Sequence, residues 1–364
     1  MNLRSFLILS ASAVIAAWAP AAKDTKLGVG DEDPVAAAEA ALEALAVDGF
    51  AGSVLVACEN DIVLHGDYGL APHDPAVVRY WVASVSKGLT AVALMKLAED
   101  GLLNVTDNVS QYFPAAPADK RDITLFQLLT HQSGLPQNYA SEGVAARDEA
   151  AASILAQPLN HPPGAQFSYS NDNYSLLAII IELSSGEPYK KFIETTISEP
   201  LDIEPVAFWP DDQRSGEYTP PLLSPPVDTG ADIDWGFLGG HGARLSVKEM
   251  HRIGLGAKQG TLIGSEGRDL LFGPHVNSSS GLGVGMGWFN EVAGDGRRML
   301  WMRGSDTSGG NALFYLVGEN GLAIAAATNA GPGEDDGPGW SRDVRDAMIS
   351  IFAPSGEEDY CTKM

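Results

Sequence analysis

Apolar and polar residues alternate in short runs near both ends of the chain, which is the pattern of β-strands. Five runs follow it, at residues 52–57, 62–69, 299–302, 312–317 and 322–328. Short polar turns separate the first two runs and again the last two, so each of these pairs predicts a hairpin. A glycine-rich run at residues 281–287 is interpreted as a further strand, because no helix start follows it as in a phosphate-binding loop. The alternation therefore predicts one antiparallel sheet built from both ends of the chain.

Helical spacing of apolar residues surrounds these strands and predicts helices at residues 33–46, 84–99, 247–255 and 340–352. Between residues 102 and 240 the pattern changes to helices, at residues 123–130 and 175–183, and to long proline-rich loops. We therefore predict a fold of the α/β type in the α+β sense, an antiparallel sheet flanked by helices. Residues 23–101 and 241–364 form the sheet-containing part, and residues 102–240 form a mostly helical insert.

The composition is that of a globular protein, with 45% hydrophobic and 19% charged residues among 364. A net charge of −24 gives a surface that repels nucleic acids and anionic membranes, so neither is expected as a partner. No cluster of His, Cys, Asp or Glu has the spacing of metal ligands, and no metal or other cofactor is expected. The expected partner is a small-molecule substrate, and the oligomeric state stays open.

Residues 1–22 resemble a secretory signal peptide, with Arg4 before an apolar run that ends in small residues. An uncleaved membrane anchor is the alternative, but the run is short for a span of about 20 residues. We predict a periplasmic or secreted protein without a stable membrane span after removal of the leader. Of the two cysteines, Cys58 lies in an apolar strand and is expected to be a buried thiol, while Cys361 belongs to a C-terminal tetrapeptide that matches a prenylation box by chance.

Ser84 lies in the first turn of a predicted, strongly apolar helix, and Lys87 follows it by three positions. Residues three apart on a helix share a face, so the lysine amine lies within reach of the serine hydroxyl. The free backbone N–H groups of a helix N-terminus favour an oxyanion at the same place. The pair is thus a candidate nucleophile and base, although an N-cap serine next to a solvated lysine gives the same pattern.

A second candidate cluster follows a proline-rich turn, where Tyr169 and Asn171 precede a predicted helix. Alternate residues of an extended segment point the same way, so the phenol and the amide are expected to face one pocket. The alternative is a tyrosine that packs a loop and an asparagine that caps a helix.

These motifs together resemble the beta-lactamase-related serine hydrolases, which include class C beta-lactamases, D-Ala-D-Ala carboxypeptidases, esterases and D-aminopeptidases. The resemblance covers nearly the whole chain after the leader. It rests on residues 80–91 around Ser84, 97–107, 123–136, the segment Tyr169-Ser170-Asn171, and residues 239–246.

The resemblance implies a role for each candidate. Ser84 would attack a carbonyl to form an acyl-enzyme, and Lys87 and Tyr169 would share the proton transfers. Because these two groups titrate as a coupled pair, the sequence does not decide which is the base. Asn171 would orient Lys87 and the substrate. Gly304 would be the glycine of the third family motif, and the backbone N–H of Ser305 would complete the oxyanion hole with that of Ser84.

The chain departs from the family at Met302, where the third motif usually has histidine or lysine. Methionine cannot bind a substrate carboxylate. Arg303 and Trp301 should point to the opposite face of their strand, so neither replaces the missing cation. The departure favours an uncharged ester or amide over a penicillin or a peptide carboxylate.

The favoured function is an exported serine hydrolase that acts on an ester or small amide. A beta-lactamase or D-amino-acid peptidase is the alternative within the class, and a catalytically weak binding protein on the same fold is the alternative from another class. His131 is interpreted as a loop-packing residue and His241 as a candidate for the pocket wall.

Overall fold

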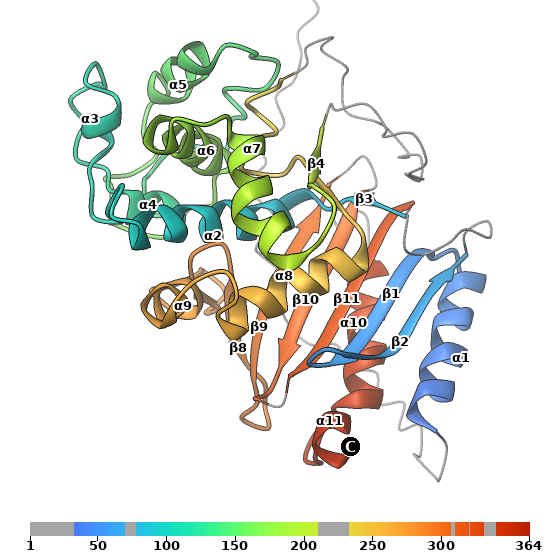
Figure 1. Cartoon of the computed structure of the whole chain (residues 1–364). Coiled ribbons are helices and arrows are strands. Elements are labelled where there is room, and N and C mark those ends of the chain that lie inside the picture. The colour runs from blue at the N-terminus through green and yellow to red at the C-terminus, as the bar shows by residue number, and fades with distance from the viewer. Residues whose placement is uncertain (1–32, 70–77, 210–232, 307–309, 320, 331–339) are drawn as a thin grey trace, which may run out of the picture.

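The computed structural model describes residues 33–69, 78–209, 233–306, 310–319, 321–330 and 340–364. Its centre is an eight-stranded antiparallel sheet in the order β2-β1-β11-β10-β9-β8-β7-β6 (Figure 1). The strands are β1 (Ala51–Cys58), β2 (Asp61–Tyr68), β6 (Val276–Asn277), β7 (Gly283–Val284), β8 (Phe289–Val292), β9 (Arg298–Ser305), β10 (Asn311–Val317) and β11 (Leu322–Ala330). The N-terminal β1 pairs with the C-terminal β11, which confirms a sheet built from both ends of the chain.

The glycine-rich run at residues 281–287 is not one strand. Only Gly283–Val284 pair as β7, because Gly281 and Gly287 have positive φ angles that end the extended backbone on either side. Gly287 also closely approaches the helix that contains Lys87, since a Cβ at this position would lie 2.8 Å from the backbone oxygen of Lys87.

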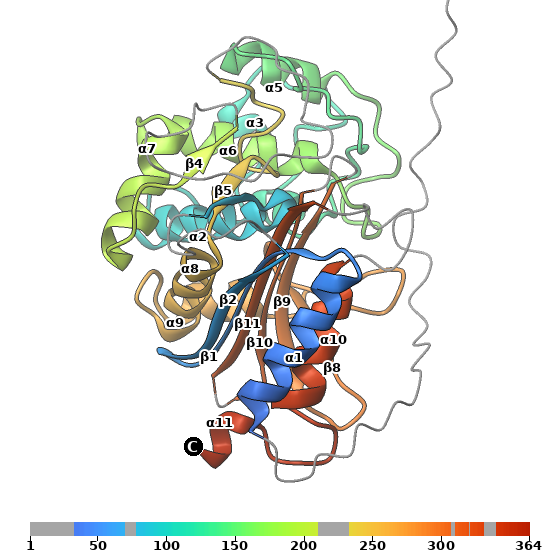
Figure 2. The ribbon, with the colours of Figure 1, turned by 90° about the vertical axis from the view of Figure 1, so that its right-hand side faces the viewer.

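Helices cover both faces of the sheet, and each face has its own apolar core (Figure 2). One face packs against α1 (Pro34–Val47) and α10 (Trp340–Phe352), which also contact each other. The other face packs against α8 (Val247–Gln259) and lies below α2 (Ser86–Glu99). The remaining C-terminal helices are α9 (Ser265–Phe272) and α11 (Tyr360–Lys363).

Five helices of the middle segment lie together at one end of the sheet, beyond α2 (Figure 1). They are α3 (Val109–Tyr112), α4 (Leu125–Leu129), α5 (Arg147–Leu155), α6 (Asn171–Ser185) and α7 (Tyr189–Ile193). A small sheet of β3 (Tyr80–Trp81), β5 (Ala243–Leu245) and β4 (Ala207–Phe208) lies near α2. Arg79, just before β3, forms a buried ion pair with Glu249 of α8 and so links the small sheet to the helix that packs on the large one.

The predicted free thiol at Cys58 is wrong, because Cys58 and Cys361 form a disulfide across 303 residues. Cys58 ends β1 and Cys361 lies in α11, so the bond fastens the C-terminal helix to the sheet. The spacing of the two cysteines along the chain carries no information about this pairing, and only the folded sheet brings them together. No helix among the described residues has the length and apolar character needed to cross a membrane, and the predicted leader lies outside these residues.

Candidate active site

Ser84 lies in a 3-10 turn, Ala83–Val85, that leads directly into α2. The prediction placed Ser84 in the first turn of the helix itself, so the α-helix begins two residues later than expected. Ala83 has a φ of +44°, a conformation that residues with a Cβ rarely adopt. Strained backbone of this kind is common beside reactive groups, where the surrounding structure holds it in place.

Lys87 extends from the first turn of α2 into a buried pocket of oxygen atoms. Its Nζ lies 3.1 Å from Ser84 Oγ, 2.5 Å from Asn171 Oδ1 and 2.7 Å from the backbone oxygen of Gly240. The side chain is 3% exposed. The sequence-predicted serine and lysine are therefore within hydrogen-bonding distance of each other.

Tyr169 approaches Ser84 from the other side. Its hydroxyl donates a 2.7 Å hydrogen bond to Ser84 Oγ, and Lys87 Nζ lies 4.9 Å from the centre of its ring. Ser170 is extended and Asn171 begins α6, so Tyr169 and Asn171 point to the same side as the alternation predicted. Tyr169 and Asn171 thus meet Ser84 and Lys87 in one cluster, although 82 positions separate Lys87 from Tyr169 in the sequence.

Burial moves the pKa values of the two ionisable groups in opposite directions. Removal from water lowers the pKa of Lys87 well below its usual value, because the charged ammonium loses hydration. Burial raises the pKa of Tyr169, and the hydrogen bond with Ser84 offsets only part of that increase. Both shifts favour the neutral forms, an amine at Lys87 and a phenol at Tyr169.

Gly304 of β9 lies directly against the nucleophile turn. A Cβ at this position would lie 2.0 Å from the backbone oxygen of Val82 and 2.8 Å from the backbone nitrogen of Ser84. Only glycine permits this approach. Ser305 follows as the last residue of β9, so the backbone that was predicted to complete the oxyanion hole runs beside Ser84.

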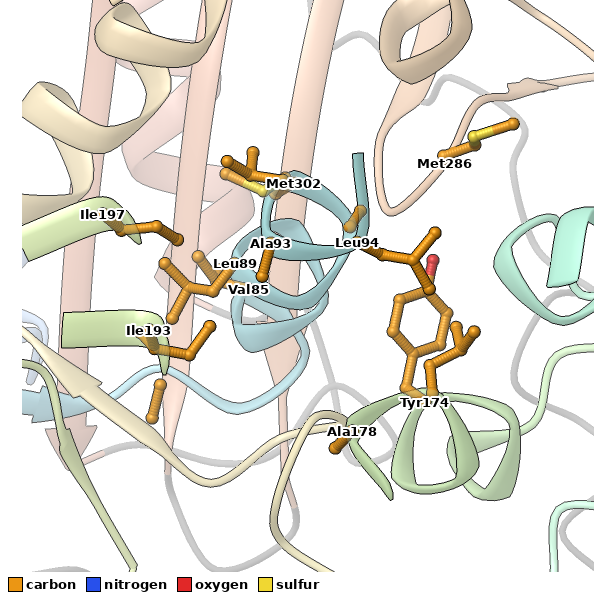
Figure 3. Close-up of a cluster of buried hydrophobic side chains, with 14 of the residues drawn as sticks. Val85, Leu89, Ala93, Leu94, Tyr174, Ala178, Ile193, Ile197, Met286 and Met302 are labelled. Atoms are coloured by element: carbon orange, nitrogen blue, oxygen red, sulfur yellow. The ribbon is translucent and has the colours of Figure 1, made fainter. Parts of the chain in front are cut away.

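Met302 lies on the same face of β9 as Gly304, and its side chain packs into the core beside α2 with Val85 and Leu89 (Figure 3). It is 3% exposed, and a Cβ added to Gly88 would lie 2.2 Å from its sulfur. The apolar side chain of Met302 therefore packs against Gly88, the residue after Lys87. The family that the sequence resembles usually has histidine or lysine at the position of Met302.

The neighbours of Met302 on β9 face away from the site, as predicted. Trp301 stacks between Phe289 and Tyr315 in the core under α1 and α10, with ring centres 4.5 and 5.6 Å apart. The charge of Arg303 acts on Tyr315 on that same far face. Neither residue is placed to bind a substrate next to Ser84.

His131 has a closer connection to the site than packing alone suggested. Its ring stacks on Tyr169 with centroids 4.3 Å apart, and its Nδ1 accepts a 3.2 Å hydrogen bond from the backbone N–H of Ser170. Burial, followed by the charge of Lys87, lowers the pKa of His131 well below its usual value. His131 is thus a neutral support for the loop that carries Tyr169.

The predicted wall residue His241 is 6% exposed and directly follows Gly240, whose carbonyl contacts Lys87. It packs edge-on against Tyr139, with ring centres 5.7 Å apart. Tyr139 was not predicted as a site residue, although this ring contact places it against the wall residue His241. No motif marks Tyr139 in the sequence; only its unusual φ of +49° in the folded loop distinguishes it.

Among the described residues, no group of three or more His, Cys, Asp or Glu side chains is placed to hold a metal ion. The site described above consists of hydroxyl, amine, amide and backbone groups. These are the groups of nucleophilic acyl transfer.

Comparisons with known proteins identify relatives of this chain. PbpX of Bacillus subtilis, named as a penicillin-binding protein, is 29% identical over 247 residues, which are 65% of this chain and 62% of PbpX. The protein flp of Staphylococcus aureus strain N315 is 31% identical over 177 residues, 45% of this chain and 36% of flp. The chain thus spans less than two thirds of the length of these curated relatives.

Solved structures share the fold at low sequence identity. An octameric penicillin-binding protein homologue from Pyrococcus abyssi superimposes with a TM-score of 0.73 and 21% identity, covering 88% of this chain and 79% of its own. A D-amino acid amidase from Ochrobactrum anthropi SV3 has a TM-score of 0.73 and 17% identity, covering 90% of this chain and 100% of its own.

The family model described as Beta-lactamase matches residues 40–348, which include every residue of the site. The chain therefore belongs to the beta-lactamase family, and its fold is that of the penicillin-binding protein homologue.

Proposed function

We propose that the protein is an exported hydrolase that forms an acyl-enzyme on Ser84 and acts on an ester or small amide. The observation that carries this proposal is the hydrogen-bonded chain from Tyr169 through Ser84 to Lys87. A nucleophile flanked by two proton-transfer groups within about 3 Å is the arrangement that covalent acyl transfer needs.

The lowered pKa of Lys87 supports a neutral amine as the base, and the contacts of its Nζ fit that form. A neutral amine has two N–H donors and one lone pair. In this form Nζ donates to Asn171 Oδ1 and to the Gly240 carbonyl, and its lone pair is left for the hydroxyl proton of Ser84, whose Oγ lies 3.1 Å away. Ser84 Oγ at the same time accepts a hydrogen bond from Tyr169. The lowered pKa of Lys87 agrees with this assignment.

In the acylation step, Ser84 Oγ bonds to the substrate carbonyl carbon while its proton passes to Lys87 Nζ. The carbonyl oxygen becomes an oxyanion, which the backbone N–H groups of Ser84 and Ser305 stabilise. When the carbonyl re-forms, the bond to the leaving group breaks and the leaving group takes a proton, with the phenol of Tyr169 as donor and Lys87 returning the proton to Tyr169. Water then attacks the acyl-enzyme and gives a proton to Lys87, the bond between the acyl carbon and Ser84 Oγ breaks, and Lys87 returns the proton to Ser84 as the carboxylic acid leaves.

Met302 supports the choice of substrate. A buried thioether beside α2 offers no charge to a substrate carboxylate, so an ester or amide without a carboxylate next to the scissile bond fits best. D-amino acid amides are the second candidate, because an amidase of that specificity shares the fold over 90% of this chain.

Two further parts of the proposal concern the chain as a whole. One is a division into a sheet part, residues 23–101 and 241–364, and a helical insert, residues 102–240, and the hydrogen bond between Ser84 and Tyr169 would then join the two parts. Export is supported by the leader-like residues 1–22 and by the disulfide between Cys58 and Cys361, since disulfides persist in oxidising compartments.

The test is covalent labelling followed by mass spectrometry. The purified protein is treated with a fluorophosphonate and, separately, with a fluorescent penicillin, alongside a Ser84→Ala variant. Ser350→Ala is the matched control, because Ser350 is exposed on α10 at the far face of the sheet. We expect fluorophosphonate labelling of Ser84 in the wild type and the control only. If neither reagent labels the protein, the result would instead favour the alternative function, a catalytically weak binding protein on the same fold.

A further inference from the structure

Residues 239–243 form a buried segment beside α2, and each of their carbonyl groups accepts a hydrogen bond. The donors are Thr90 Oγ1 for Gly239 at 2.7 Å, Lys87 Nζ for Gly240 at 2.7 Å, the indole N–H of Trp81 for His241, the backbone N–H of Trp209 for Gly242 at 2.8 Å, and that of Val82 for Ala243 at 3.0 Å. Apart from Trp209, these donors lie between residues 81 and 90, on either side of Ser84. The segment that offers an acceptor to Lys87 is therefore fastened to the stretch of chain that carries the nucleophile.

Ser86 fastens one end of this segment to the turn that contains Ser84. The hydroxyl of Ser86 accepts a 3.0 Å hydrogen bond from the backbone N–H of Ala243 and donates one of 2.6 Å to the carbonyl of Ala83. Its side chain is fully buried. Because Ala83 is the residue with the unusual φ angle, Ser86 joins the strained turn and the segment 239–243 into one unit.

Thr90 fastens the other end of the segment, at Gly239. It follows Lys87 by three positions on α2, so the two side chains share a face of the helix. They bind adjacent carbonyls, those of Gly239 and Gly240. Because a carbonyl has no proton to give, the 2.7 Å contact between Thr90 Oγ1 and Gly239 requires that the threonine hydroxyl donates. The single proton of that hydroxyl is thus used on Gly239.

The phenol of Tyr189, on α7, contacts the same threonine. Its oxygen lies 2.8 Å from Thr90 Oγ1, and since the threonine proton is used on Gly239, the phenol is the donor in this pair. Tyr189 is 1% exposed and Thr90 is fully buried. The hydrogen bonds therefore run from Tyr189 through Thr90 to the carbonyl of Gly239. Removal of the phenol would leave the bond from Thr90 to Gly239 in place.

Gly239 and Gly240 depend on such hydrogen bonds because glycine lacks the Cβ that restricts the backbone of other residues. Gly239 has a φ of +76°, in the left-handed region that glycine adopts readily. The direction of the Gly240 carbonyl is consequently set by the hydrogen bonds to its two neighbours in the chain, from Thr90 on one side and from Trp81 on the other.

The carbonyl of Gly240 affects acyl transfer because it binds one N–H group of Lys87. Under the proposed function, the neutral amine donates to this carbonyl and to Asn171, and its lone pair faces Ser84. If the carbonyl turns away, the freed N–H group can rotate toward Ser84 Oγ, and the lone pair then points elsewhere. Loss of this acceptor also disfavours the charged ammonium form of Lys87 relative to the amine.

We infer that Thr90 is a positioning residue for the base Lys87. Its hydroxyl holds the carbonyl of Gly239, and the carbonyl of Gly240 is thereby kept on Lys87 Nζ. The amine then presents its lone pair to Ser84. Thr90 acts through Lys87 rather than on the reacting atoms. The inference rests on the proposed function, in which Lys87 takes the proton of Ser84.

The experiment measures the rate at which a fluorophosphonate labels Ser84 across the pH range in which Lys87 titrates. Rates at several probe concentrations separate the maximal labelling rate from the concentration that gives half of it. Thr90→Val replaces the hydroxyl by a methyl group of similar size. We expect this variant to lower the maximal rate about tenfold, with little change in the half-saturating concentration. The rise of the rate with pH should move to lower pH, because the ammonium form of Lys87 has lost an acceptor.

Tyr189→Phe is the matched control. It removes a buried hydroxyl from the same series of hydrogen bonds but leaves the bond from Thr90 to Gly239, so the maximal rate and its pH dependence should stay near those of the wild type. Thr90→Ser restores a hydroxyl and should recover most of the rate. Thr90→Ala, which lacks the hydroxyl and adds no bulk, takes the place of Thr90→Val if urea unfolding shows that the valine variant does not fold.

The outcomes separate this inference from the proposed function. A Thr90→Val protein that labels at the wild-type rate, with the same pH dependence, would overturn the positioning role and leave the hydrolase standing. Equal effects of Thr90→Val and Tyr189→Phe on the rate and its pH dependence would also overturn it, because the two hydroxyls would then contribute only to packing. Failure of Ser84 labelling in the wild type would refute the hydrolase itself.

Discussion

The imidazole of His131 stacks on the phenol ring of Tyr169 with centroids 4.3 Å apart and planes inclined by 28°. His131 Nδ1 also accepts the backbone N–H of Ser170, the residue between Tyr169 and Asn171. Two contacts from one side chain therefore hold the loop that presents both site residues. The nucleophile and its partners come from separate segments, and His131 is part of what fixes their spacing.

We predict that His131→Phe lowers kcat while leaving KM nearly unchanged. Phenylalanine keeps a ring under Tyr169 but leaves the buried N–H of Ser170 without an acceptor, which costs about 1–3 kcal/mol in the free energy of unfolding. His131→Asn keeps an acceptor and should recover part of kcat. His275→Phe is the control, because His275 packs on Phe126 with no contact to Tyr169. Steady-state kinetics and urea unfolding measure both effects, and an unaltered kcat in His131→Phe would contradict the supporting role.

The pH dependence of acylation should follow Lys87. Because burial lowers its pKa, the neutral amine is already populated below the usual lysine pKa of about 10.4, so kcat/KM should rise with pH through a limb below that value. The raised pKa of Tyr169 keeps the phenol protonated on the alkaline side of that limb. Tyr169→Phe should lower the plateau without removing the limb, whereas loss of the limb in that variant would identify tyrosine as the base.

The same shift predicts how stability depends on pH. The folded-state pKa of Lys87 lies below its unfolded value, so between the two pKa values the unfolded chain binds more protons. The free energy of unfolding should therefore rise with pH across that window and gain nothing from Lys87 above it. Lys87→Met should flatten this rise. Thermal melts of the wild type and of Lys87→Met at several pH values and constant salt measure this rise. Equal slopes of stability against pH in the two proteins would show that folding does not lower the pKa of Lys87.

Gly304→Ala should abolish turnover. The added Cβ would meet the Val82 carbonyl and the Ser84 nitrogen, and these are backbone atoms that cannot rotate away. The nucleophile turn and β9 would have to separate, which displaces the proposed oxyanion donors. Gly294→Ala is the matched control, since a Cβ there would meet no atom within 4 Å. Fluorophosphonate labelling rates report the outcome, and a Gly304→Ala protein that labels at the wild-type rate would refute this placement of β9.

Much of this arrangement follows from local sequence. The alternation that predicts β10 and β11 and the helical spacing that predicts α10 are short-range patterns. The fold preserves them because apolar side chains pack against both faces of the sheet. Ser84, Lys87, Tyr169 and Asn171 were found because their motifs have fixed local spacing. The position of Met302 and the outward direction of Trp301 follow from the period of a strand.

Other features depend on contacts that no local pattern encodes. The position of Tyr139 against His241 depends on a positive φ angle and on Asp172, which is distant in the sequence and anchors the Tyr139 loop. Whether lysine or tyrosine is the base depends on how deeply each is buried, which spacing alone does not report. The breaks in the glycine-rich segment arise from positive φ angles at Gly281 and Gly287, where alternation suggested one continuous strand.

The sequence did not predict the disulfide either, because its two cysteines meet only in the folded chain. The bond allows a test of its own. Cys58 and Cys361 close a loop across 303 residues, and such cross-links stabilise mainly by limiting the unfolded chain. Reduction of the disulfide, or replacement of both Cys58 and Cys361 by serine, should lower the free energy of unfolding by about 2–5 kcal/mol. Activity at room temperature should persist, since the bond lies at the opposite end of the sheet from α2 (Figure 1). Thermal melts with and without reductant, and thiol alkylation of the unfolded protein, measure this. A melting temperature that does not respond to reductant would show that the two thiols are not joined in solution.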